Sequence, residues 1–401
     1  MIHLRKGANN EDLLELNRAL VTQHLKRKKI CSRAELAKET GLTQASITKI
    51  IAGLIKYNIV KEVGTIDGKK GRRSIGLALN SDAYKVIGVK ISRKSFSVGV
   101  FDIGGKHYDI YLEEIDVVDG VRNTIKRIKN SINEMLLKYT NIVAIGIAVP
   151  GPYLKNVGKI ALMTEVPGWE DVSLSEEFVN AYEIPVYIEH DANAGALAEW
   201  WFGSHNIHQG VMVHILAGEG IGAGVVIDGN VLQGSHGIAG EIGHMSIDIN
   251  GRKCSCGNRG CLETYCSSIA FVKDAVTGLP NHPNSQLNLY TQLTADDIFN
   301  CAKAGDEYAK HLVLNVARYM AHGIANIINA YDPDIIVISD IMSHGGDLLL
   351  NEILKILEDC VWDFIYKDIL IALSSFEVET ILYGAAAIAT DQFLKNPSKF
   401  L

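Results

Sequence analysis

Four potential metal ligands lie close together in the second half of the sequence. The segment 237–263, GIAGEIGHMSIDINGRKCSCGNRGCLE, contains His244, Cys254, Cys256 and Cys261, and its cysteines follow a C-x-C-G-x-x-G-C arrangement. One imidazole and three thiolates suit tetrahedral Zn²⁺, and a site filled by four protein ligands leaves no position for a reactive water. The pattern therefore predicts a structural zinc site. The alternative is a tight cysteine-bearing turn beside a buried histidine.

Two carboxylates flank these ligands. Glu241 lies three residues before His244, and Glu263 lies two residues after Cys261. A folded metal site would hold both carboxylates at fixed positions, because the chain on either side of a ligand is fixed with it. Glu241 and Glu263 are therefore candidates for contacts with a polar ligand.

The composition is that of a globular protein. The 401 residues, 47% of them hydrophobic, are enough for two or three domains with cores of their own. No apolar run is long enough to cross a bilayer, and the first residues, MIHLRKGANNEDLLELN, lack the apolar core of a secretion signal. The seven cysteines do not form a disulfide framework, which fits a reducing compartment. We expect a cytoplasmic protein without a membrane segment.

The net charge of −7 conceals a difference between two parts of the chain. Residues 1–80 contain 16 Lys and Arg against 7 Asp and Glu, whereas the remainder contains 23 against 39. The first part is therefore basic and the rest acidic. A basic segment of this size is typical of a nucleic-acid-binding module, although a run of charge alone is more often a solvated surface.

The pattern within residues 1–80 predicts a winged helix-turn-helix. Leucines at near-helical spacing predict a helix over about 11–29, and Ser32 with Glu35 forms a capping box that starts a second helix. Gly41 supplies a turn, and Thr43 can cap a third helix. The apolar stripe of this third helix comprises Ile47, Ile50, Ile51, Leu54 and Ile55.

The third helix and the hairpin after it carry the candidate DNA contacts. Gln44, Ser46, Thr48 and Lys49 lie on the polar face of the helix, which is the geometry of a helix that enters the major groove. Strands at 59–63 and 74–79 enclose a glycine-flanked basic loop, where Arg72 and Arg73 could reach phosphates or the minor groove. A helical bundle used for protein contacts is the alternative.

The remainder of the chain predicts two α/β halves with a ligand-binding cleft between them. The first half contains two strands around a polar turn within 84–103, a helix at 121–139, strands at 142–148 and 186–189, the loop His190-Asp191 and a helix at 193–201. The second half contains strands at 211–216 and 225–227 around a glycine-rich turn at 218–224, helices at 294–304 and 306–329, a strand at 334–339 and a closing helix from Gly384 to about 393.

These motifs together resemble the ROK family, which groups bacterial sugar-responsive repressors with sugar kinases. The resemblance covers nearly the whole chain, and GEIGH with C-x-C-G-x-x-G-C-L-E at 240–263 is its most specific element. The triplet Asp191-Ala192-Asn193, the turn Val149-Pro150-Gly151-Pro152 and Pro167-Gly168-Trp169 support it. The resemblance implies a winged helix-turn-helix followed by a two-lobed actin/hexokinase-like (ribonuclease H-like) α/β domain.

The resemblance also implies roles for single residues. It places zinc on His244, Cys254, Cys256 and Cys261, and sugar hydroxyls on Asp191, Glu241, His244 and Glu263. Carboxylates and a metal-oriented imidazole suit the hydrogen bonds of vicinal diols. Position 190 departs from the family pattern, because the usual Asn is His190, which we count with the sugar-binding candidates.

The phosphate-binding loops distinguish a repressor from a kinase. Kinases of the family share an early D-x-G-G-T loop, and the sequence here is Lys90-Ile91-Ser92-Arg93-Lys94. The second loop, usually G-T-G-I-G, is Gly218-Glu219-Gly220-Ile221-Gly222, so Glu219 places a negative charge where phosphates would lie. We therefore expect no enzymatic activity. A sugar kinase with an accessory DNA-binding head is the alternative.

The expected function is transcription regulation of carbohydrate metabolism. We predict a repressor that binds a double-stranded DNA operator as a homodimer or dimer of dimers and responds to a small sugar, with xylose first. An inducer that is a phosphosugar or a partner protein stays open. The expected domains are 1–80 for DNA binding, 81–192 with helix 385–396 for the first lobe, and 193–384 for the second lobe with the zinc site.

Overall fold

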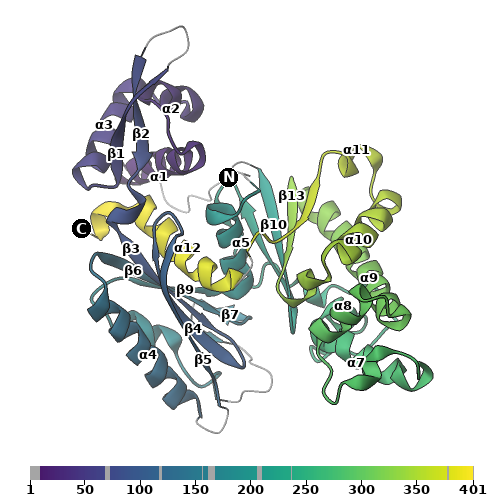
Figure 1. The fold of residues 1–401 in the computed structure, drawn as a ribbon. Helices are drawn as coiled ribbons and strands as arrows, with labels where there is room; N and C mark the ends of the chain where they lie inside the picture. The colour runs from purple at the N-terminus through teal and green to yellow at the C-terminus, as the bar shows by residue number, and fades with distance from the viewer. Residues whose placement is uncertain are drawn as a thin grey trace. The chain divides into compact units, whose positions relative to one another are not determined.

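Figure 1 shows the computed structural model, which describes residues 10–67, 73–116, 120–155, 157–160, 168–205, 210–235, 237–376 and 379–400. The chain divides into two compact units. Unit 1 comprises residues 1–194 and 381–401, and unit 2 comprises residues 195–380. In the described ranges, no helix is both long and apolar enough to cross a membrane.

Unit 1 begins with three helices and a hairpin, α1 (Asn10–Lys28), α2 (Arg33–Thr40), α3 (Gln44–Lys56), β1 (Val60–Asp67) and β2 (Arg73–Leu79). The capping box is present as predicted, because the Ser32 Oγ accepts from the Glu35 amide at 3.2 Å and the Glu35 carboxylate accepts from the Ser32 amide at 2.8 Å. Gly41 ends α2 in the left-handed conformation, with φ 70°. This order of elements is that of a winged helix-turn-helix.

Helix α3 buries the predicted stripe. Ile47, Ile50, Ile51 and Leu54 are buried, and only Ile55 of the predicted set is half-buried. The hairpin is longer than predicted, because β1 continues through a bulge between Glu62 and Thr65. The two strands pair again beyond the bulge, and the sequence does not indicate the position of the bulge.

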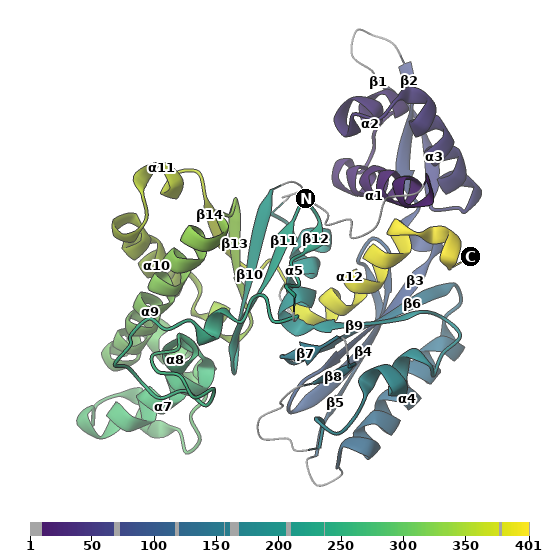
Figure 2. The ribbon, with the colours of Figure 1, turned by 180° about the vertical axis from the view of Figure 1, so that it is seen from behind.

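The first lobe of unit 1 is a five-stranded sheet with helices on both faces. The sheet order is β5-β4-β3-β6-β9, with β3 (Lys85–Ile91), β4 (Ser95–Asp102), β5 (His107–Glu114), β6 (Ile142–Val149) and β9 (Val186–His190). Strands β3, β4 and β5 are antiparallel neighbours, and β6 and β9 join in parallel. Helix α4 (Gly120–Lys138) covers one face and α12 (Thr380–Lys395) the other, and a short hairpin of β7 (Tyr153–Leu154) and β8 (Lys159–Ile160) follows β6 (Figure 2).

Two glycines allow α12 to approach this sheet closely. A Cβ atom on Gly146 would lie 1.9 Å from the Ala385 carbonyl oxygen, and one on Gly88 would lie 2.8 Å from the Leu382 carbonyl oxygen. Both distances are too short for any side chain. The backbone of α12 therefore packs directly on β3 and β6.

Unit 2 repeats the strand plan. Its sheet order is β12-β11-β10-β13-β14, with β10 (Val211–Ala217), β11 (Ile221–Ile227), β12 (Asn230–Val231), β13 (Ile335–Ser339) and β14 (Leu370–Leu373). Its helices are α6 (Glu263–Cys266), α7 (Ser268–Gly278), α8 (Ala295–Lys303), α9 (Glu307–Tyr331), α10 (Gly346–Cys360) and α11 (Asp363–Tyr366), and α5 (Asp191–Phe202) connects unit 1 to unit 2. The core between the sheet and α9 includes Ile215, Ile338, Val313 and Ala317.

Three predicted boundaries differ from the structure. His190 ends β9 and Asp191 begins α5, so the two residues do not form a loop. Strand β11 begins at Ile221 rather than 225, because Ala217 pairs with Ile221 across a three-residue turn. Helix α12 begins at Thr380, and Gly384 lies where that helix meets Ala194, with a would-be Cβ 2.2 Å from its carbonyl oxygen. Glycines that look like loop or cap signals here serve close packing.

Candidate functional site

The four predicted metal ligands lie together in unit 2. The ligand atoms of His244, Cys254, Cys256 and Cys261 all lie within 4.8 Å of one another. The Cys254 Sγ lies 3.7 Å from the His244 Nδ1, and the Cys256 and Cys261 sulfurs are also 3.7 Å apart. Tetrahedral Zn–S bonds of about 2.3 Å place neighbouring ligands about 3.8 Å apart. The four residues therefore fit a tetrahedral metal ion.

A small hairpin positions the cysteines. Lys253 and Arg259 pair across it, and the Cys254 amide donates to the Asn258 carbonyl at 2.9 Å. Gly260 packs against the Asp248 carbonyl, where a Cβ would lie 1.7 Å from the oxygen. The glycine at 260 thus lets the hairpin fold tightly enough to bring Cys261 back toward Cys254.

The surroundings of Cys256 and Cys261 shift the pKa values of their thiols in opposite directions. Burial, with hydrogen bonds to the neighbouring cysteines, raises the pKa of Cys261 to about 12. A hydrogen bond from the Asn258 backbone lowers the pKa of Cys256. A divalent cation binds thiolates, so it would be needed to keep all three sulfurs deprotonated.

The hairpin is tied to the helices of unit 2 through Arg252 and Leu262. The Arg252 amide donates to the Tyr265 hydroxyl at 2.9 Å, and its guanidinium lies 4.5 Å from the Tyr265 ring centroid and pairs with Asp274 at 2.9 Å. Leu262 packs on Gly323 of α9, where a Cβ would lie 2.5 Å from its side chain. The metal ligands therefore rest on α6, α7 and α9.

Glu241 and Glu263 flank the four ligands in the sequence. Glu241 is half-buried and precedes the short 3₁₀ turn Ile242–His244. Glu263 begins α6, and its Oε2 accepts a long hydrogen bond of 3.4 Å from the Ile221 amide. Both carboxylates thus belong to the same unit as His244, and that of Glu263 lies at the turn that leads into β11.

His190 and Asp191 lie in unit 1. The His190 Nε2 is 3.0 Å from the Asp191 Oδ1, which also accepts from the Ala192 amide at 2.7 Å. The His190 ring packs on Gly151, where a Cβ would lie 2.1 Å from the Nε2. The five sugar-binding candidates are therefore divided between the two units, and their assembly into one site stays a proposal.

Sequence reasoning missed a polar cluster beside His190. Glu189 is 7% exposed and forms an ion pair with Lys155 from the loop after β7. Its Oε1 accepts from the Asn193 side chain at 3.2 Å and from the His190 amide at 3.1 Å. An acidic residue at the end of an apolar strand was a usable signal, whereas nothing in the sequence pairs Lys155 with it.

Sequence reasoning also missed Asp340, which follows β13. Its backbone has φ 66° and ψ −165°, a conformation that glycine adopts readily and other residues rarely. Its Oδ2 lies 2.2 Å from the position of a Cβ on Gly218, so the carboxylate packs on the turn 218–220. A second acidic side chain thus joins Glu219 at this turn.

The helices and strands from α1 to β2 are called the head below. Most of the predicted DNA contacts are on its surface. Gln44, Thr48 and Lys49 are exposed on α3, and Ser46 is half-buried with its hydroxyl 2.9 Å from that of Thr43. The Thr48 hydroxyl donates to the Gln44 carbonyl at 2.8 Å. Arg73 is exposed at the start of β2, and Arg72 lies outside the described residues. Gln44 and Lys49 are therefore better placed for base or phosphate contacts than the two hydroxyls.

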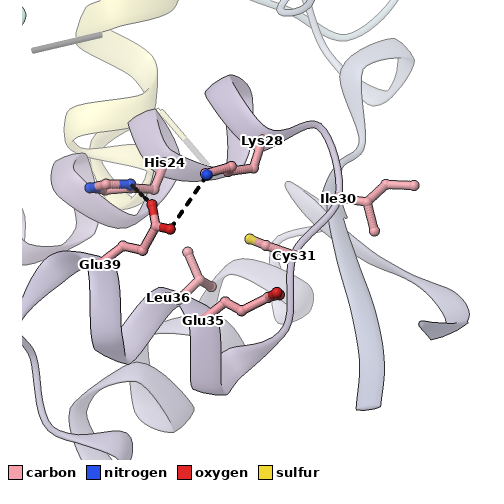
Figure 3. Close-up of a pocket in the computed structure, with 7 residues that line it drawn as sticks. All are labelled: His24, Lys28, Ile30, Cys31, Glu35, Leu36 and Glu39. Atoms are coloured by element: carbon pink, nitrogen blue, oxygen red, sulfur yellow. Dashed lines mark ion pairs between the residues drawn. The ribbon is translucent and has the colours of Figure 1, made fainter. Parts of the chain in front are cut away.

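A small pocket lies between α1 and α2 of the head (Figure 3). Glu39 pairs there with Lys28 at 3.4 Å and with the His24 Nδ1 at 3.8 Å. The cavity volume is about 60 Å³, far below the ~300–1,000 Å³ of small-molecule sites. This pocket is too small for a sugar. The residues that line it are His24, Lys28, Ile30, Cys31, Glu35, Leu36 and Glu39.

The arrangement of two sheets with the same strand plan, one His/Cys₃ cluster and a winged helix-turn-helix head defines a class of two-lobed, actin/hexokinase-like proteins. Residues 86–392 match the ROK family, and the chain belongs to that family. The family match begins after the head, so the head is an addition to the two-lobed domain.

Similar proteins match either nearly the whole chain or about two thirds of it. The xylose repressor of Caldicellulosiruptor bescii is 29% identical over 400 residues, which cover 97% of this chain and 99% of the repressor. A glucokinase of Halalkalibacterium halodurans is 33% identical over 276 residues, covering 67% of this chain and 83% of the kinase. The crystal structure of a ROK family transcriptional regulator, a homologue of the Escherichia coli MLC protein, superposes with a TM-score of 0.81 at 29% identity and covers 96% of this chain and 97% of that one.

Proposed function

We propose that the chain is a sugar-responsive transcriptional repressor of carbohydrate-utilisation genes. The observation that carries the proposal is the presence of a winged helix-turn-helix, with polar side chains exposed on α3, in the same chain as a ROK domain. Similarity to a xylose repressor over nearly the full length of both chains supports it. The protein acts on double-stranded DNA in the cytoplasm as a homodimer or dimer of dimers.

We propose three functional regions within the two units. Residues 1–80 bind the operator, residues 81–192 with the C-terminal helix 385–396 form the first lobe, and residues 193–384 form the second lobe. Gln44, Ser46, Thr48 and Lys49 read the major groove, and Arg72 and Arg73 contact phosphates or the minor groove.

The metal in the second lobe is a structural Zn²⁺ held by His244, Cys254, Cys256 and Cys261. The donor set and its spacing support zinc over a harder cation, because thiolates are soft ligands. All four ligands come from the protein, so the ion fixes His244 and the flanking carboxylates and takes no part in a reaction.

The effector is a sugar whose hydroxyls contact His190, Asp191, Glu241, His244 and Glu263. Xylose is the first candidate because of the similarity to a xylose repressor. Glucose, an N-acetylhexosamine or a glycoside suits the same donors and acceptors. A phosphosugar or a partner protein is the remaining alternative, and binding isotherms for free sugars against their phosphates separate them.

The second candidate function is that of a sugar kinase, which the similarity to a glucokinase favours. Three features argue against it. Lys90 to Lys94 replace a glycine-rich phosphate loop, Glu219 adds a negative charge to the second loop, and the Asp340 carboxylate packs on Gly218 of that loop. Two carboxylates at one turn repel phosphates.

The test measures DNA binding and ATP turnover on the same preparation. Gel-shift affinity for an operator should change with at least one of xylose, glucose and N-acetylglucosamine, and no sugar should cause ATP turnover. Phosphorylation of any sugar that Asp191→Asn abolishes would establish the kinase instead. Operator affinity unchanged by every sugar that binds would contradict the sugar response.

A further inference from the structure

The connection between the head and the first lobe, both within unit 1, is short and is hydrogen-bonded to each of them. Only residues 80–84 separate β2 from β3. The Asn80 side chain donates to the Asn58 carbonyl at 3.2 Å and to its side-chain oxygen at 2.9 Å, on the head. The Asn141 side chain donates to the Ala83 carbonyl at 3.3 Å, on the body. The head is therefore docked on the first lobe and not carried on a free tether.

Tyr84, the last residue of this connection, contacts both the recognition helix and α12. Its hydroxyl donates to the Tyr57 carbonyl at 2.5 Å, and Tyr57 is the C-cap of α3. Its ring lies against Phe393 of α12, with centroids 5.1 Å apart at 55°. The Tyr84 side chain thus connects the end of α3 to α12.

The segment that follows α12 also reaches α1 of the head. The Asn396 side chain, in a residue that is 7% exposed, donates to the Glu15 Oε1, and the Lys399 ammonium lies 3.6 Å from the same oxygen. The other end of α1 is held by Lys26, whose ammonium donates to the Gly104 carbonyl at 2.8 Å. Helix α1 is therefore fixed near both ends on the first lobe.

Helix α12 begins where the chain returns from unit 2. Unit 2 ends at residue 380, and α12 runs from Thr380 to Lys395. Its backbone packs on β3 and β6 through Gly88 and Gly146, so it cannot shift without changing those contacts. The chain therefore leads from unit 2 directly into the first residue of α12, while Phe393 near the other end of the helix contacts Tyr84 and Asn396 just beyond it contacts α1.

We propose that α12 and Tyr84 couple the effector-binding ROK domain to α3, the proposed DNA-recognition helix, and that Tyr84 is the residue that positions α3. This inference rests on the proposed function and assigns its regulation to named contacts. The proposal requires two states of the ROK domain that differ in sugar affinity, and the contact of Tyr84 with Tyr57 then carries part of the coupling free energy between sugar and DNA. Removing that contact leaves both binding surfaces in place and weakens the coupling.

The test compares the full-length wild type with Tyr84→Phe, which keeps the ring on Phe393 and removes the hydroxyl. The matched control is Tyr111→Phe, which removes a tyrosine hydroxyl that donates to Glu113 on the exposed strand β5. The DNA is the duplex that the wild type selects from a randomised library. The sugars are xylose, glucose and N-acetylglucosamine.

Two readouts decide the outcome. Amide hydrogen exchange without sugar should be faster in the last turn of α3 in Tyr84→Phe by a factor of about three to ten, the worth of one hydrogen bond. The fold-change in operator affinity on adding sugar should fall by a similar factor, with sugar affinity unchanged. The control should match the wild type in both readouts.

The two proposals fail in different ways. If no sugar changes the operator affinity of the wild type, the proposed sugar response is wrong. The hydrogen-exchange comparison still decides whether Tyr84 positions α3. Equal exchange in α3 for the wild type and Tyr84→Phe, or an unreduced sugar response in that variant, overturns the role of Tyr84. Asn396→Ala supplies a second variant, at the contact between α1 and the segment after α12, and amide exchange in α1 should become faster in the same way.

Discussion

The Asp340 Oδ2 lies 2.2 Å from the position that a Cβ atom on Gly218 would occupy. The carboxylate therefore fills the space beside the turn 218–220, at the ends of the parallel strands β10 and β13. Ligands of α/β proteins bind outside such strand ends. In this chain the same place holds a side chain from the protein itself, in a backbone conformation that favours glycine.

Gly218→Ala should destabilise unit 2, because the added Cβ meets the Asp340 carboxylate. The expected loss in the free energy of unfolding is about 1–3 kcal/mol. Asp340→Gly removes both the collision and the backbone strain, so the double variant should recover most of that loss. Urea unfolding of the wild type, both single variants and the double variant gives the interaction energy as a double-mutant cycle.

The control for this cycle is Gly53→Ala on α3, where an added Cβ has no neighbour within 4 Å. Alanine is the better helix former, so this variant should be neutral or slightly stabilising. Additivity of Gly218→Ala and Asp340→Gly would mean that the two residues do not compete for the same space.

Local chemistry made part of this fold predictable. The Ser32 and Glu35 capping box, the glycine turn at Gly41 and the apolar stripe of α3 depend on residues within a few positions of one another, and the structure confirms them. The four metal ligands were predictable for the same reason, since they lie within 18 residues of sequence. Short-range patterns carry their own geometry.

Contacts between distant segments were not predictable. Lys155 pairs with Glu189 across 34 positions, and Asn396 with Glu15 across 381. Nothing in the sequence indicates that Gly146 packs on α12, and Gly384, which the sequence predicts to begin the closing helix, lies inside α12 against Ala194. Such residues become informative only when the packing of α12 is known.

Cys256→Ser should lower metal content and the thermal stability of unit 2. Loss of one thiolate weakens a structural zinc site whose binding free energy is folding free energy, and the expected loss is several kcal/mol in order of magnitude. Metal analysis should give one zinc per chain for the wild type and much less for the variant. Cys360→Ser, an exposed cysteine outside the cluster, should match the wild type.

The same variant separates two roles for the metal. If zinc holds His244, Glu241 and Glu263 for the effector, then Cys256→Ser or a chelator removes the sugar response before it removes DNA binding. Loss of DNA binding first, measured by gel shift across a chelator titration, would assign the metal to the dimer or to the fold as a whole.

Arg73→Ala should weaken binding to all DNA sequences by a similar factor. An exposed arginine at the start of β2 suits a phosphate contact, so the slope of log affinity against log salt should become shallower by about one. Gln44→Ala should instead change which operator is preferred, by about 1–3 kcal/mol at one base position. Selection from a randomised duplex library at several salt concentrations measures both effects. A shift in base preference for Arg73→Ala would assign that side chain to base readout.

Lys26 should make the stability of the head depend on alkaline pH. Burial lowers the pKa of Lys26 from 10.5 to about 8, against the opposing effect of Asp102. Between these values the unfolded chain binds more protons than the folded one, so this contribution to stability rises with pH from about 8 to 10.5 and is least favourable below 8. Lys26→Met lacks the titrating group. The wild type should therefore gain stability relative to Lys26→Met over this window, by an amount on the order of 1 kcal/mol.

Urea unfolding followed by circular dichroism at pH 7, 8, 9 and about 10 measures this difference directly. The matched control is Lys38→Met, because Lys38 is exposed on α2 and is not one of the charges that shift the pKa of Lys26. Its stability relative to the wild type should not change with pH. Parallel pH profiles for the wild type and Lys26→Met would mean that the Lys26 ammonium stays hydrated in the folded protein. In that case its hydrogen bond to the Gly104 carbonyl would hold α1 on the first lobe without a cost of burial.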